Sequence, residues 1–116
     1  MRVIELLHVN VEVTDVDRAL AFYRLFGLTE IERQGTPGRA GAWFSFPDGC
    51  QLHISLGSSP APGRQHFAIR VADLAAARAA IEAAGAPIER EREIPGMTRF
   101  FTRDPDGNRI EIVQMG

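Results

Sequence analysis

His8-Val-Asn-Val-Glu-Val-Thr-Asp15 and His66-Phe-Ala-Ile-Arg-Val-Ala-Asp73 are two versions of one stretch, and they lie 58 residues apart in a chain of 116 residues. The same offset places Gly27 on Gly85 without a gap. A constant offset of half the chain length indicates an internal repeat. The sequence therefore predicts two copies of one structural unit.

Each copy has the same order of predicted elements. The alternation of apolar and polar residues over 7–13 predicts a half-buried strand. Asp15 then occupies an N-cap position, apolar residues follow at helical spacing, and Gly27 stands where a helix ends. The second copy repeats this pattern with Asp73 and Gly85. Three shorter strands follow each helix, at about 28–33, 41–46 and 51–56 in the first copy and at about 87–93, 98–103 and 109–114 in the second.

The fold class that follows is α+β, with two tandem βαβββ modules over about 1–57 and 64–116 in a single domain over 1–116. The Gly-, Ser- and Pro-rich stretch 57–63 is the expected linker. The stretch 34–41 is a second flexible segment, which either rims a site or forms a plain surface loop.

Composition excludes several classes of function. The 13 basic residues do not exceed the 15 acidic ones, so a nucleic-acid partner is not expected. Every basic residue is Arg, which excludes Schiff-base chemistry and a P-loop lysine, and the single Cys50 excludes an internal disulfide. No stretch approaches the ~20 apolar residues of a membrane span, and no signal peptide is evident. We therefore expect a cytoplasmic protein without membrane association.

The three histidines, His8, His53 and His66, all lie in strand patterns. His8 and His66 are repeat mates, and the mate of His53 is Glu111. Alternation points these four side chains away from the apolar positions that face the helices, which are Val9, Val11, Leu52 and Ile54 in the first copy and Phe67, Ile69, Ile110 and Ile112 in the second.

Two units related by a two-fold axis would bring these four side chains together. Three imidazoles and a carboxylate suit one divalent ion per site, such as Zn²⁺, Fe²⁺, Ni²⁺, Mn²⁺ or Co²⁺. The alternative is four separate strand residues on a solvated face of a sheet, and the residues alone leave it open.

Three stretches resemble a known family. They are Leu7–Asp15 continuing to Ala21-Phe22-Tyr23-Arg24-Leu25-Phe26-Gly27-Leu28, the stretch His66–Asp73, and Arg103-Asp-Pro-Asp-Gly-Asn-Arg-Ile-Glu-Ile112. Together they resemble the vicinal oxygen chelate superfamily, which includes glyoxalase I, extradiol dioxygenases and the bleomycin resistance proteins. The resemblance covers nearly the whole chain, and the closing stretch is the most specific.

This resemblance implies paired modules that form an open, cup-like, barrel-like sheet with the helices packed outside, and it implies a homodimer. It also implies His8, His53, His66 and Glu111 as metal ligands. The position of His53 varies in the family, being Glu in glyoxalase I, so His53 is either a ligand or a residue that supports one. The site forms either within one chain or between two.

The implied function is chelation of a small oxygen-rich substrate through adjacent oxygens, by an enzyme of lyase or isomerase type with glyoxalase-like proton transfer. Glu111 is the expected catalytic base. Because His53 replaces a ligand glutamate, lactoylglutathione lyase activity itself is not implied. The alternatives are a non-catalytic drug- or conjugate-binding protein of the bleomycin-resistance type and a small extradiol-type dioxygenase.

Substrate contacts are expected from Trp43, Phe101, Arg103 and Asn10. Trp43 and Phe101 are repeat mates and suit an apolar or flat substrate, although simple packing explains them as well. Arg99 and Arg103 could hold a substrate carboxylate, but solvated surface side chains are the simpler interpretation. The alternating charges of Glu89-Arg-Glu-Arg-Glu93 predict an exposed edge strand without a function of its own.

Overall fold

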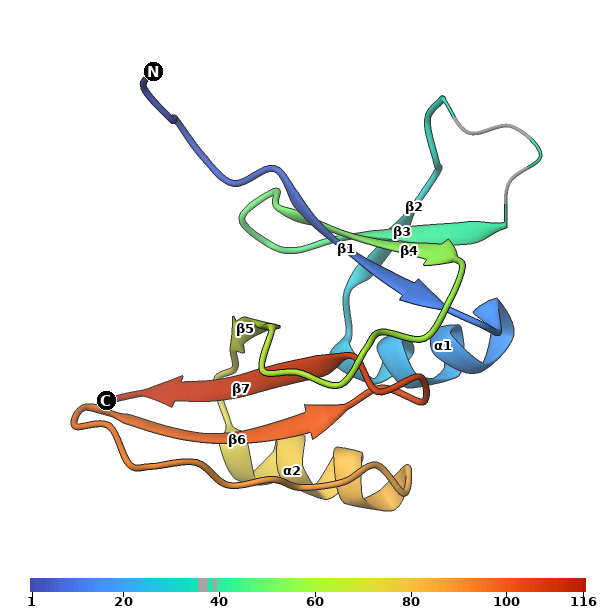
Figure 1. Ribbon diagram of the computed structural model, residues 1–116. Coiled ribbons are helices and arrows are strands. Elements are labelled where there is room, and N and C mark those ends of the chain that lie inside the picture. The colour runs from blue at the N-terminus through green and yellow to red at the C-terminus, as the bar shows by residue number, and fades with distance from the viewer. Residues whose placement is uncertain (36–37, 39) are drawn as a thin grey trace. The chain divides into compact units, whose positions relative to one another are not determined.

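The chain forms two compact units, Met1–Ser59 and Pro60–Gly116, in a computed structural model that describes residues 1–35, 38 and 40–116 (Figure 1). The boundary between the units falls inside the stretch 57–63. The predicted flexible stretch 34–41 includes residues 36, 37 and 39, which lie outside the described residues.

Unit 1 contains a four-stranded sheet of order β1-β4-β3-β2. Strand β1 pairs in parallel with β4, and the other neighbours pair antiparallel. Its elements in chain order are β1 (His8–Val13), α1 (Val16–Tyr23), the 3₁₀ helix η1 (Arg24–Phe26), β2 (Thr29–Ile31), β3 (Gly41–Ser45) and β4 (Gln51–Leu56).

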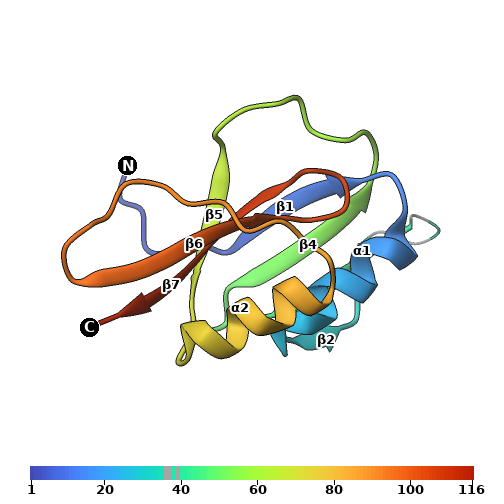
Figure 2. The ribbon, with the colours of Figure 1, turned by 90° about the horizontal axis from the view of Figure 1, so that it is seen from below.

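Unit 2 contains a three-stranded sheet of order β5-β7-β6. Strand β5 is parallel to β7, and β6 is antiparallel to β7. The elements are β5 (His66–Arg70), α2 (Leu74–Ala83), β6 (Met97–Arg103) and β7 (Arg109–Met115), with α2 lying along β6 and β7 (Figure 2). The predicted α+β class is confirmed.

Both helices begin and end where the sequence predicts. The side chain of Asp15 accepts a hydrogen bond from the backbone N–H of Arg18, and that of Asp73 accepts one from the N–H of Ala76, each over 3.0 Å. These bonds satisfy amide groups that a helix start leaves without a partner. Gly27 and Gly85 follow with φ of 68° and 78°, the left-handed conformation that terminates helices.

The apolar faces of the strands form the cores. In unit 1, Leu52 and Val13 are fully buried, and Tyr23 of α1 is buried as well. In unit 2, Ile110 and Ile112 are buried. Because side chains alternate across a strand, this burial directs the neighbouring polar residues to the opposite face of each sheet.

The strand register confirms the repeat. Asn10 pairs with His53 in unit 1, and Ala68 pairs with Glu111 in unit 2, so the offset of 58 is kept on both strands of the pair. The antiparallel pairs Trp43–His53 and Phe101–Glu111 keep the same offset. The two units therefore place equivalent residues at equivalent points of their sheets.

The predicted strand 87–93 is wrong. Only two isolated bridges form in this region, Glu89–Phe101 and Ile94–Met97. The bridge Glu89–Phe101 is equivalent to the pair Ile31–Trp43 at the end of β2. Unit 2 therefore keeps one of the three residue pairs that join β2 to β3 in unit 1. Pro87, which replaces Thr29 at this offset, has no N–H to donate to a sheet.

Candidate metal centre

Two histidines of unit 1 lie in contact on the same face of the sheet. The rings of His8 and His53 are stacked with centroids 4.0 Å apart. The other face of His53 stacks on Trp43 at 3.9 Å, with the ring planes within 2°. His53 is thereby buried to 8% exposure, although it lies on the side of the sheet away from the core.

The environment of His53 favours a neutral imidazole. Burial lowers its pKa below the ordinary value, and the positive charges of His8 and Arg33 lower it further. Its Nε2 lies 2.8 Å from the side-chain oxygen of Gln51, which can only accept a hydrogen bond. The hydrogen of the neutral ring is therefore on Nε2, and the lone pair is on Nδ1.

The equivalent face of unit 2 pairs a histidine with a carboxylate. Nε2 of His66 lies 3.0 Å from Oε1 of Glu111. Nδ1 of the same ring lies 2.8 Å from the backbone carbonyl of Arg64, so Nδ1 is the donor. In a neutral ring, Nε2 then carries a lone pair and accepts hydrogen bonds. It faces Oε1 of Glu111, which also accepts hydrogen bonds. This contact is favourable only when a proton or another cation lies between the two atoms.

Glu111 is held by Arg99, for which the sequence suggests either a substrate carboxylate or solvent as the partner. Oε2 of Glu111 lies 3.2 Å from a terminal nitrogen of Arg99, and both side chains are nearly buried, at 11% and 12% exposure. The other terminal nitrogen of Arg99 donates to the carbonyl of Arg92 over 2.7 Å. Arg99 therefore occupies one carboxylate oxygen and leaves the other to His66.

Phe101 fills the space beside this pair. It is buried to 2% exposure, and its ring meets His66 edge-on at 5.1 Å. The guanidinium of Arg109 lies 3.7 Å above the centroid of the same ring, a cation–π contact. Phe101 thus packs within unit 2, whereas its repeat mate Trp43 is only half-buried on its stack.

Two acidic residues of the stretch 89–93 have partners in this unit. Glu89 is 2.8 Å from Arg103, and Glu91 is 2.6 Å from Arg109. The hydrogen bond from Arg109 lowers the pKa of Glu91. Residues 90–93 are exposed, as expected, but they form no edge strand, and Glu89 and Glu91 neutralise two arginines of the sheet. Arg103 is engaged by Glu89 and by the carbonyl of Gly107 rather than by solvent alone.

The structure brings the four predicted ligands together as two pairs, His8 with His53 in unit 1 and His66 with Glu111 in unit 2. Among residues 1–35, 38 and 40–116, no group of three or more histidine, cysteine or acidic side chains is gathered closely enough to hold a metal ion. Asn10, another predicted contact residue, is exposed and accepts a hydrogen bond from Ser55 over 2.7 Å.

Sequence reasoning missed two supports of the pair in unit 2. One is the carbonyl of Arg64, which has no side-chain signature. The other is the role of Arg99, whose position two residues before Phe101 puts it on the same face of β6 as Phe101. That spacing was the available signal for a buried partner of Glu111.

The fold is that of a known class of protein. The chain belongs to the Glyoxalase/Bleomycin resistance protein/Dioxygenase superfamily, whose family model matches residues 5–112. In the described part of the chain, no helix is long and apolar enough to cross a membrane.

Among curated proteins, lactoylglutathione lyase of Arabidopsis thaliana is 30% identical over 127 residues, which cover 95% of this chain and 44% of that protein. The chain thus spans less than half the length of this relative. A solved glyoxalase family protein from Bacillus anthracis has a TM-score of 0.85 and 28% identity, with full coverage of both chains.

The fosfomycin resistance protein FosX from Listeria monocytogenes has a TM-score of 0.84 and 21% identity, covering 99% of this chain and 94% of that one. A variant of FosX was solved with Mn(II) and 1S,2S-dihydroxypropylphosphonic acid. At this level of identity the likeness shows the fold alone.

Proposed function

We propose that the protein is a metal-dependent enzyme of lyase or isomerase type, which binds a small oxygen-rich substrate through adjacent oxygens. The observation that carries this proposal is the contact between Nε2 of His66 and Oε1 of Glu111 at 3.0 Å. When the ring of His66 is neutral, both atoms accept hydrogen bonds, and a bound cation would make their contact favourable. The bond from His66 to the carbonyl of Arg64 fixes which ring nitrogen faces the carboxylate.

The residues present fit a divalent ion. Imidazole nitrogen and carboxylate oxygen are the donors that Zn²⁺, Fe²⁺, Ni²⁺, Mn²⁺ and Co²⁺ accept, and each of these ions would be bound once per site. His66 and Glu111 would hold it from unit 2, and His8 from unit 1, with His53 either as a fourth ligand or as the support of His8. When bound, such an ion supplies a Lewis acid that stabilises negative charge developing on a substrate oxygen.

The chain's own residues supply the base and the contacts to the substrate. Glu111 is the acidic group of the set and the base for a proton on carbon next to a substrate carbonyl. Arg99 holds Oε2 of Glu111 and fixes the orientation of this carboxylate. Trp43 would offer a flat, half-buried surface to the substrate. Asn10 and Arg103 are the further substrate contacts of this proposal. Phe101, whose ring is 2% exposed, would support the site through its contact with His66.

The assembly that completes the site is a homodimer or a single chain. If it is a dimer, His8 of one copy and Glu111 of the other share one ion. Mixing the two inactive variants His8→Ala and Glu111→Ala then restores activity, because one of the two sites of the mixed dimer has all its ligands. If the site lies within one chain, the mixture stays inactive.

The test is turnover by protein loaded with each of the five ions. The panel contains the hemithioacetal of an α-ketoaldehyde with a thiol, an epimerisable α-hydroxy ketone and a catechol. We expect turnover of one of the first two, and loss of it in Glu111→Gln. Turnover of the catechol instead would assign the dioxygenase alternative. No turnover with any ion would contradict an enzymatic function.

One observation favours the second candidate, a non-catalytic binding protein. The stack of His8, His53 and Trp43 presents layered rings on one face of a sheet, which suits a flat aromatic ligand such as a drug. Binding of such a ligand that survives chelator treatment, without turnover of the panel, would support this function.

A further inference from the structure

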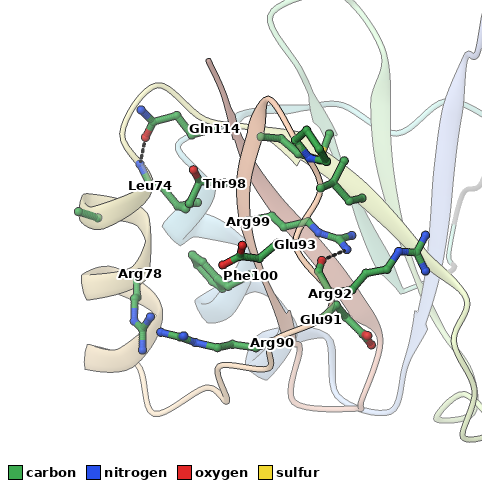
Figure 3. Close-up of a pocket in the computed structure, with 14 residues that line it drawn as sticks. Leu74, Arg78, Arg90, Glu91, Arg92, Glu93, Thr98, Arg99, Phe100 and Gln114 are labelled. Atoms are coloured by element: carbon green, nitrogen blue, oxygen red, sulfur yellow. Dashed lines mark hydrogen bonds between the residues drawn. The ribbon is translucent and has the colours of Figure 1, made fainter.

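A pocket of about 950 Å³ lies within unit 2, between α2, the segment 90–95 and β6 (Figure 3). His66 and Glu111 are not among its lining residues. Its apolar lining comes from Leu74 and Ala75 of α2, from Ile94 and Pro95, and from Met97 and Phe100 of β6. The volume is in the range of sites for small molecules, ~300–1,000 Å³.

The pocket exists because the edge of β6 is only partly covered. The bridges Glu89–Phe101 and Ile94–Met97 leave the residues between them without backbone pairing to β6. The segment is held instead by Arg99, which donates to the carbonyl of Arg92 across the pocket (Figure 3). The chain therefore arches away from the sheet over 90–93, and a space remains beneath it.

Two arginines extend toward the same end of this pocket, Arg78 from α2 and Arg90 from the arched segment (Figure 3). Arg78 pairs with Glu82 one helical turn away, over 2.6 Å and at the surface. The side chain of Arg90 has no hydrogen bond or ion pair within the residues that the structure describes. Guanidinium groups favour paired contacts with carboxylate or phosphate, so this end of the pocket attracts an anion.

The repeat shows that the fold does not require these charges. At the offset of 58, Arg78 lies on Leu20, and Arg90 lies on Glu32. Unit 1 thus carries an apolar residue and an acidic residue at these positions. The two arginines are therefore particular to unit 2, where the segment 90–93 leaves the edge of β6.

We propose that this pocket binds a small organic anion, whose carboxylate or phosphate contacts Arg78 and Arg90 and whose apolar body packs on Leu74 and Met97. Glu93 also lines the pocket and has no ion pair in the described part of the chain, so its negative charge opposes the ligand. This inference does not rest on the proposed metal chemistry, since no metal ligand lines the pocket.

Calorimetric titration with octanoate, octyl phosphate and inorganic phosphate, in the presence of EDTA, tests the proposal. We expect both octyl compounds to bind the full chain with saturation and inorganic phosphate to bind at least tenfold more weakly, because it lacks the apolar body. The difference in affinity between octanoate and octyl phosphate identifies the preferred anionic group.

Three variants sharpen the test. The double change Arg78→Gln and Arg90→Gln should weaken octyl binding about tenfold or more, since charge-assisted hydrogen bonds are lost. Arg24→Gln removes one exposed arginine of unit 1 and should leave binding unchanged. Glu93→Gln should tighten binding. Far-UV circular dichroism and the urea midpoint of each variant establish that it is folded.

The proposal is overturned if neither octyl compound binds the wild-type protein with saturation, or if the folded double variant binds as tightly as the wild type. Should the double variant fail to fold, Arg90→Gln alone serves, because Arg90 has no partner within the described residues. Equal affinity of Arg90→Gln and wild type would overturn the proposal as well.

Discussion

Nε2 of His66 lies 3.0 Å from Oε1 of Glu111, on equivalent strands to those that carry His8 and His53. Hydrogen bonds to Arg64 and Arg99 orient this pair from both sides. Such oriented pairs of imidazole and carboxylate are typical of metal ligands, whose positions are set by the groups behind them.

Removal of the guanidinium behind Glu111 should weaken metal binding. Arg99→Met leaves Oε2 of Glu111 without its partner at 3.2 Å, so the carboxylate loses its fixed orientation. We expect metal affinity to fall by about 10–100-fold, the typical effect of losing an outer partner of a ligand. Competition with a chromophoric chelator measures this, and Arg24→Met is the matched control. Unchanged affinity would show that Arg99 only packs.

Truncation of Phe101 should strongly destabilise the protein. Its ring is 2% exposed and lies between His66 and Arg109. Phe101→Ala should cost about 3–5 kcal/mol of unfolding free energy, because it leaves a cavity in a close-packed region. Phe101→Leu, which keeps most of the volume, should cost less. Urea denaturation measures both, and equal small losses would contradict the packing described for Phe101.

Acidification should destabilise the metal-free protein through His53. The pKa of His53 in the folded chain lies below its ordinary value of 6.5, mainly because the ring is buried. Below about pH 6.5, His53 binds a proton in the unfolded chain but remains neutral in the folded chain until the pH reaches its lowered pKa. The free energy of unfolding therefore falls as the pH drops from about 6.5 through the lowered pKa. His53→Gln should flatten this part of the profile.

Urea midpoints at pH values from 8 to 5, in the presence of EDTA, test this dependence. The wild-type curve should drop more steeply than that of His53→Gln below pH 6.5. Parallel curves would mean that His53 titrates in the folded chain as it does in the unfolded one, which would contradict the burial of His53 in its stack with Trp43.

Much of the fold could be predicted from the repeat. Asp15 and Asp73 cap their helices as expected, and the offset of 58 survives in the strand register. The absence of a strand over 87–93 could not be predicted, because the alternating charges there contact Arg103 and Arg109 rather than line a sheet edge. Alternation along one strand does not show which side chains it meets on other strands.

The sequence predicts only part of the candidate site, because alternation gives the face of each strand but not its contacts with other strands. Alternation places His8 and His53 on one face, as the structure has them, but the ring stack with Trp43 depends on pairing between β3 and β4. Likewise, the sequence offers only a substrate carboxylate or solvent as partners of Arg99, because the distance from Arg99 to Glu111 is set by the register of β6 on β7.

Metal content is the most direct test of the central claim. Elemental analysis of purified wild-type protein should find about one divalent ion per site, and His8→Ala, His66→Ala and Glu111→Ala should each lose it while remaining folded. Arg24→Gln, which lies outside the candidate site, should keep its ion. If the wild type binds none of the five ions on reconstitution, or if Glu111→Ala retains a full complement, His66 and Glu111 do not form a metal site.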